Sequence, residues 1–135
     1  MPGEPSDRGR HAALLGEAEA VASLTAAGYR ILARNYRCPF GEIDIVAEEG
    51  EVLVFVEVKA RSSLAFGLPH DAITPAKRRR LARSAVHYLL HHAIEERPYR
   101  MDVVSVYLHR GEVMGTEILR GAFSLEEEME RLAGE

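Results

Sequence analysis

Apolar and polar residues alternate along two stretches of the chain and merge into a nearly continuous apolar run in a third. Stretches 29–37 and 41–49 alternate, whereas 51–60 is apolar apart from its first residue, Glu57 and Lys59. Alternation is typical of strands with one buried face, and a continuous apolar run is typical of a strand covered on both faces. The short connections between these stretches predict an antiparallel meander, in which we expect the third strand to be central.

Helical periodicity precedes and follows these strands. Residues 11–27 are predicted to form a helix, with Gly28 just past its end. Its apolar stripe is expected to contain Leu14, Ala18, Val21, Leu24 and Thr25. A second helix is predicted from Pro75 to about residue 94, because Thr74 suits an N-cap and proline suits the first helical position.

Two more strands, 100–109 and 112–120, are predicted after the second helix. A strand that reaches the next strand through a helix favours parallel, right-handed pairing. The element order αβββαββ therefore predicts an α/β fold with a mixed central sheet flanked by helices. We expect a mobile segment at 1–10, a single domain at 11–123, and an acidic tail or short helix at 124–135, where Ser124 and Glu127 form a capping-box pattern.

The composition is that of an ordinary globular domain, with 47% hydrophobic and 28% charged residues among 135. No apolar run is long enough to cross a bilayer, and the first ten residues lack the apolar core of a secretory signal. Because Cys38 is the only cysteine, no internal disulfide can form. A reducing, cytoplasmic location without membrane association is therefore expected.

The net charge of −4 argues against indiscriminate coating of nucleic acid, but it conceals a basic run at 77–83, KRRRLAR. A local basic face can contact phosphates even when the whole molecule is acidic. The polar face of the second predicted helix carries Arg80, Arg83, Ser84, His87 and His91. We take Arg80, Arg83 and His87 as candidate nucleic-acid-binding residues, although a solvated helix face explains the run equally well.

Several charged residues lie on the predicted central strands, where a hydrophobic core disfavours charge. Glu57 and Lys59 share one face of the central strand, and Glu42 and Asp44 share one face of the strand before it. Pairing of these strands about the turn at 49–50 brings Asp44 close to Glu57. Neighbouring carboxylates raise each other's pKa unless a cation lies between them, so a divalent metal accounts for the pair.

Helical spacing aims a third carboxylate, that of Glu17, at the same sheet. Burying such charges without partners costs several kcal/mol per ion, so a purely structural reason for all of them is hard to find. The simpler alternative is an ordinary ion pair between Glu57 and Lys59 on an exposed strand face, since such pairs are common and weak.

An ordered set of motifs is made up of Glu17, GEID (41–44), VFVEVKAR (54–61), Phe66-Gly67 with Pro69, and Lys77. This set resembles the YraN family of small bacterial proteins, the UPF0102-type predicted endonucleases. That family is similar to archaeal Holliday junction resolvases within the PD-(D/E)XK nuclease superfamily, whose fold is a restriction-endonuclease-like αβββαβ core. The resemblance covers about residues 10–110. It departs from the superfamily pattern at Ile43, where a proline normally precedes the first catalytic aspartate.

The resemblance implies a nuclease that hydrolyses DNA phosphodiester bonds, with branched DNA as a possible substrate and a homodimer as a possible assembly. The implied catalytic residues are Glu17, Asp44, Glu57 and Lys59. The metal ligands would be Asp44, Glu57, the Val58 carbonyl, and Glu17 directly or through water, whereas Lys59 would orient or help to deprotonate the attacking water. Supporting residues would be Glu42, Arg61 and Lys77. An all-oxygen ligand set favours Mg²⁺ or Mn²⁺ over Zn²⁺.

Two other functions remain open. A non-catalytic nucleic-acid-binding protein could retain the nuclease fold; the modest overall charge favours it, and the intact acid–acid–lysine set opposes it. A metal-dependent hydrolase of small phosphoesters is the second. His87 and His91 lie four residues apart on the predicted helix and could hold a metal, but their polar face without a nearby acid favours contact with solvent or phosphate.

Overall fold

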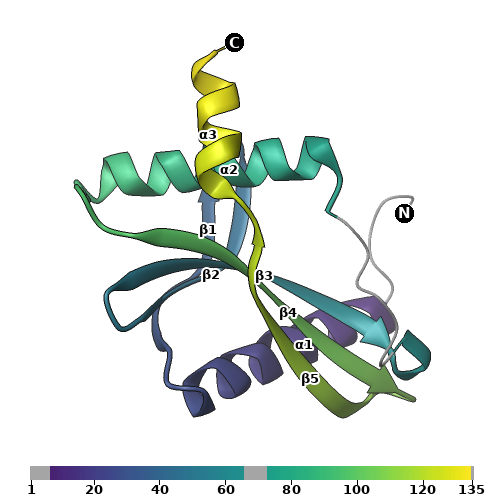
Figure 1. Cartoon of the computed structure of the whole chain (residues 1–135). Helices are drawn as coiled ribbons and strands as arrows, with labels where there is room; N and C mark the ends of the chain where they lie inside the picture. The colour runs from purple at the N-terminus through teal and green to yellow at the C-terminus, as the bar shows by residue number, and fades with distance from the viewer. Residues whose placement is uncertain (1–6, 66–72, 135) are drawn as a thin grey trace.

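The computed structural model describes residues 7–65 and 73–134 and contains a five-stranded sheet flanked by three helices (Figure 1). The strands are β1 (Arg30–Cys38), β2 (Gly41–Glu49), β3 (Val52–Ser62), β4 (Tyr99–His109) and β5 (Glu112–Phe123). The α-helices are α1 (Asp7–Ala26), α2 (Pro75–His91) and α3 (Leu125–Ala133), and a short 3-10 helix, η1, spans Ser63–Ala65. The predicted α/β fold is confirmed, and the arrangement is compatible with a restriction-endonuclease-like core.

The strands lie in the order β1-β2-β3-β4-β5, so β3 is central as predicted. β1, β2 and β3 form an antiparallel meander, β3 pairs with β4 in parallel, and β5 returns antiparallel to β4. The parallel pair is the one whose strands are joined through α2, because a helical crossover returns the chain in its original direction.

The helix ends follow the capping residues of the sequence. The Thr74 side chain accepts a hydrogen bond from the Lys77 backbone N–H at 3.2 Å, and Ser124 caps α3 in the same way. Just past the end of α1 lies Gly28, whose φ of 95° favours glycine. α1 begins at Asp7, so residues 7–10, which the sequence assigns to a mobile segment, are helical. Residues 1–6 and the Phe66-Gly67 and Pro69 motif positions lie outside the described residues.

The sheet separates two apolar cores. α2 and α3 cover one face and α1 covers the other (Figure 1). β3 contributes to both cores, since Leu53 and Phe55 pack beneath α2 whereas Val54 and Val56 pack beneath α1. None of the helices in the described ranges is sufficiently long and apolar to span a membrane.

The buried face of α1 differs from the predicted stripe. Gly16, Ala20 and Leu24 are buried. Leu14, Ala18 and Thr25 are exposed, so the prediction for these three residues is wrong. The reason is side-chain size. A Cβ on Gly16 would lie 3.5 Å from the Cβ of Ala60, so a small residue lets the helix approach the sheet closely.

Helical periodicity predicts Ser84 on the polar face of α2, and this prediction is also wrong. Ser84 is buried, and its hydroxyl lies 3.4 Å from the Cys38 thiol at the end of β1. A small hydroxyl with a neighbouring polar partner is tolerated inside the protein, so the hydrophobic pattern alone does not place such a residue.

Candidate functional site

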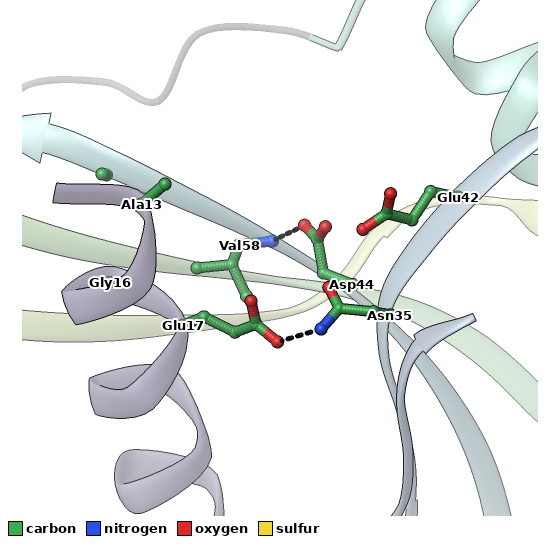
Figure 2. A pocket seen from close by; sticks show the side chains of 8 residues that line it. Ala13, Gly16, Glu17, Asn35, Glu42, Asp44 and Val58 are labelled. Carbon is green, nitrogen blue, oxygen red and sulfur yellow. Dashed lines mark hydrogen bonds between the residues drawn. The ribbon is translucent and has the colours of Figure 1, made fainter. Parts of the chain in front are cut away.

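The candidate site lies where β2 and β3 part. The ladder between these strands runs from Glu49↔Val52 to Ile45↔Val56 and stops there, although both strands continue. The first residues beyond the ladder are Asp44 and Glu57. Where a regular ladder would continue with a backbone–backbone hydrogen bond, the Val58 backbone N–H instead donates to the side-chain Oδ2 of Asp44 at 2.8 Å (Figure 2).

A bend in β2 accompanies this opening. Ile43 packs beneath α2 and Ile45 packs beneath α1, although residues two apart on a regular strand share a face. On the neighbouring strand, Asn35 has a φ of 53° between the residues that pair with Ile43 and Ile45. Asp44 therefore lies at the bend, and it lines pockets on both sides of the strands.

The first pocket opens on the α1 side and has a volume of about 250 Å³. Glu17, Asn35, Glu42, Asp44 and Val58 line it (Figure 2). Glu17 Oε1 accepts a hydrogen bond from Asn35 Nδ2 at 2.9 Å and lies 3.4 Å from Arg34 Nε. The predicted direction of Glu17 is therefore confirmed, and its partners come from β1.

The second pocket opens on the α2 side and has a volume of about 240 Å³. Its lining includes Glu42, Asp44, Glu57, Lys77 and Arg80. Lys77 Nζ lies 3.1 Å from Glu57 Oε1. The cation in contact with the buried Glu57 is thus the lysine in the first turn of α2.

The carboxyl group of Asp44 is held in an unfavourable environment for its charge. Burial raises the pKa of Asp44 to about 6, and the negative charge of Glu57 acts in the same direction. The hydrogen bond from Val58 and the charge of Lys77 oppose this shift without cancelling it. Burial is thus the main cause of the shift, and the repulsion by a neighbouring carboxylate that the sequence predicts is the second.

The structure divides the candidate residues between two faces of the sheet. Glu17 is on the α1 side, Glu57 is on the α2 side, and Asp44 lies between them. Alternation along β3 places Glu57 with Leu53 and Phe55 on the α2 side, so Glu17 and Glu57 do not meet beneath the first helix. Lys59 and Arg61 continue along β3 past Glu57, and Lys59 makes no hydrogen bond or ion pair with another described residue.

Asn35 is a site residue that the sequence analysis missed. It lines the first pocket and holds Glu17. The signal for it was an asparagine inside an alternating strand, since asparagine is among the few non-glycine residues that adopt a positive φ readily.

The donor atoms suit a hard divalent cation. Asp44, Glu57 and the Val58 carbonyl offer oxygen ligands, which Mg²⁺ and Mn²⁺ prefer. Within residues 7–65 and 73–134, however, no three acidic, histidine or cysteine side chains are grouped closely enough to hold a metal. Lys77 is paired with Glu57, and Asn35 is hydrogen-bonded to Glu17. The residues fit a cation held by Asp44 and Glu57. Glu17 could join as a third carboxylate ligand if it released Asn35.

The candidate nucleic-acid-binding residues follow α2 away from this site. Arg80 lines the second pocket, next to Lys77. Arg83 and His87 lie farther along the helix and line a third pocket together with Phe40. The ring of His87 is hydrogen-bonded through Nδ1 to the hydroxyl of Tyr36, and burial lowers the pKa of His87.

These features define a mixed α/β protein whose acidic, lysine-containing site lies where two central strands separate. A family model described as "Uncharacterised protein family UPF0102" matches residues 16–106, and the chain belongs to this family. The resemblance to the YraN family is thereby confirmed, since the two are the same family. The matched region contains every candidate metal ligand.

Curated relatives extend over most of the chain. A UPF0102 protein of Moorella thermoacetica is 54% identical over 110 residues, which are 81% of this chain and 92% of the relative. One from Renibacterium salmoninarum is 50% identical over 107 residues, or 79% of this chain and 91% of the relative. One from Geotalea daltonii is 39% identical over 125 residues, or 93% and 98% of the two chains.

Proposed function

We propose that this protein is a Mg²⁺- or Mn²⁺-dependent endonuclease that hydrolyses DNA phosphodiester bonds. The observation that carries the proposal is the carboxyl pair of Asp44 and Glu57 at the opening between β2 and β3. Burial and repulsion raise the pKa of Asp44 to about 6. A divalent cation between the two carboxylates removes this repulsion, and a single lysine removes only part of it.

Asp44, Glu57 and the Val58 carbonyl would hold the ion, and Glu17 would approach it from the α1 side. When bound, the ion supplies Lewis acidity and an activated water for attack on phosphorus. Lys77 already neutralises Glu57 at 3.1 Å. Its ammonium would turn to a non-bridging phosphate oxygen when the substrate fills the second pocket, and Lys59 would orient the attacking water.

The basic side chains of α2 support a nucleic-acid substrate. Arg80 lines the same pocket as Glu57, so a phosphate that enters the pocket meets a guanidinium beside the acidic pair. Arg83 and His87 extend this side of the helix. Contacts of this kind position the backbone and read no sequence, which suits an enzyme that selects DNA by its structure.

The test is cleavage of labelled DNA, both linear duplex and four-way junction, in Mn²⁺. The wild-type protein is expected to cut, and Asp44→Asn or Glu57→Gln is expected to reduce the rate at least about a hundredfold, since removal of a ligand takes away several kcal/mol of transition-state stabilisation. Glu112→Gln, at the exposed first residue of β5, is the matched control and should retain the wild-type rate. Equal rates for the wild type and Asp44→Asn would refute the proposal.

The Glu57–Lys77 ion pair favours one alternative, a non-catalytic DNA-binding protein, because it satisfies a buried carboxylate without a metal. The same experiment separates the two functions. If the wild type and Asp44→Asn bind junction DNA equally and neither cuts it, the binding protein is correct.

A further inference from the structure

A third pocket, of about 490 Å³, lies between α2 and α3, apart from the acidic site. Its walls are mostly apolar and include Phe40, Leu90, Met129 and Leu132. Two of these residues are unusually open to solvent for their type, with Leu90 74% and Phe40 46% exposed. An exposed apolar hollow of this size marks a surface that binds something.

We propose that this pocket binds an unpaired nucleobase, so that the substrate carries single-stranded nucleotides beside the scissile duplex. The inference rests on the proposed function, and it specifies which DNA that site takes. Aromatic side chains next to a basic groove are the usual platform for single-stranded DNA, because every base offers a flat face for stacking.

The aromatic side chains are placed for this role. Phe40 is half-exposed, and its ring lies edge-on to His87 with centroids 6.2 Å apart. The rings of His87 and His91 are stacked at 3.8 Å. Flat rings therefore border the pocket on the α2 side and at the β1–β2 turn, and Leu90 and Met129 supply the apolar wall.

The pocket is connected to the acidic site through two elements. Arg80 lines the acidic site and His87 lines the apolar pocket. These residues are seven apart on α2, a distance of about 10 Å, which equals the rise of about three stacked nucleotides. Phe40 also directly precedes Gly41, which lines the second acidic pocket. A DNA strand with one phosphate in the second pocket, beside Glu57, can thus reach the third pocket within a few nucleotides.

Charge favours a nucleotide over other occupants. Arg83 contributes a positive charge to the lining, and no acidic side chain of the described residues contributes to it. The exposed acids of α3, Glu126, Glu127 and Glu130, repel phosphate. A nucleic-acid backbone is therefore confined to the α2 side, which is the side that leads to the acidic site.

The test uses a duplex with a single-stranded tail that contains 2-aminopurine, compared with the fully paired duplex, in EDTA so that no cleavage occurs. The wild type is expected to bind the tailed DNA about tenfold more tightly, as one stacked base provides, and to quench the fluorescence of the tail. Phe40→Ala and Leu90→Ala should lose both effects. Leu90 is a second variant because its exposed side chain can be removed without opening the core.

The control is Leu64→Ala, since Leu64 is an 87% exposed leucine on η1 that does not line the pocket. It should behave as the wild type. Equal binding of the two DNAs by the wild type, or unchanged quenching in both pocket variants, would overturn the inference and leave the pocket to another occupant, such as an amphipathic helix of a partner.

The two proposals fail separately. A protein that prefers tailed DNA but never cuts it in Mn²⁺ retains the base pocket and refutes the nuclease. A protein that cuts duplex DNA without preference for the tail refutes the pocket alone.

Discussion

Asp44 carries a cost in stability that its position in the site explains. In the folded protein its pKa rises from 3.8 to about 6. The folded state therefore binds this proton more tightly than the unfolded state does. The protonated Asp44 therefore contributes to the free energy of unfolding fully below the unfolded pKa, and this contribution is lost as the pH rises through about 6. At neutral pH the ionised Asp44 destabilises the fold.

Asp44→Asn is therefore expected to stabilise the protein at pH 8, in the absence of divalent metals. The gain should be about 1–2 kcal/mol, since the shift is discounted for the partial exposure of the side chain. Near pH 4 the gain should largely disappear, because the wild-type carboxyl is then protonated in the folded state. Urea unfolding at both pH values measures the difference, and an equal effect at both would contradict the assignment.

Asp102, unlike Asp44, is a buried carboxylate that accepts several hydrogen bonds. It is fully buried and accepts hydrogen bonds from the Tyr29 hydroxyl at 2.7 Å, Arg100 Nε at 2.8 Å and the Gly121 backbone N–H at 3.0 Å. Arg100 also reaches Glu49, whose pKa falls to about 2 beside Arg120 and Arg100. These contacts join β2, β4 and β5.

Asp102→Ala is expected to destabilise the protein by about 3–5 kcal/mol, because it leaves Arg100 half-buried without its main partner. Tyr29→Phe removes one hydrogen bond and should cost only about 1 kcal/mol. Chemical denaturation of both variants provides the comparison. If the two changes had similar effects, the network would not be centred on Asp102.

At the scale of elements, α1 owes its position to small side chains. A Cβ at Gly16 would meet Ala60 at 3.5 Å, which is ordinary contact, so Gly16→Ala should be tolerated and should gain up to about 1 kcal/mol from helix propensity. Gly16→Leu should push α1 from the sheet and cost about 1–3 kcal/mol. Thermal unfolding of the two variants tests this, and equal stability would show that the contact is not close.

Features that depend on neighbouring residues could be predicted from the sequence, whereas features that depend on distant residues could not. The strands, the caps at Thr74 and Ser124, and the parallel β3–β4 pair were predicted because each depends on nearby residues or on chain direction. The exposed Leu14 and the buried Ser84 were not, because packing against distant residues decides them.

The candidate site shows this distinction again. The proximity of Asp44 and Glu57 followed from strand pairing about one turn. The bend of β2 at Asp44 did not, because alternation assumes a regular strand. The pairing of Glu57 with Lys77 depends on how α2 crosses the sheet, which no spacing within β3 reveals. The sequence thus placed the acids on the correct strands but could not assign each to its face.

At the scale of the whole molecule, cation binding should be linked to stability. Mn²⁺ is expected to raise the melting temperature of the wild type but not that of Asp44→Asn, since a ligand stabilises only the state that binds it. Lys77→Met should melt lower than the wild type in EDTA, because Glu57 loses its partner, and should gain more from Mn²⁺. Differential scanning fluorimetry gives both values, and a smaller gain for Lys77→Met would contradict this competition.

DNA binding by the whole molecule should depend on salt through α2. Replacing both Arg80 and Arg83 with alanine should weaken binding and reduce the slope of log K against log salt by about 2, since each phosphate that is no longer neutralised lowers the slope by about 0.9. Arg110→Asn, in the exposed β4–β5 turn, serves as a charge-matched control for one substitution. Fluorescence anisotropy over a range of salt concentrations measures the slopes, and unchanged binding would remove α2 from the interface.

The parting of β2 and β3 places a pocket on each face of the sheet at the same point. Asp44 and Glu42 border hollows on both sides of this opening, whereas Glu17 borders only one and Glu57 only the other. The two pockets thus share two carboxylates, those of Asp44 and Glu42. If a bulky substrate fills the α2-side pocket, the α1-side pocket offers water a separate approach to Asp44.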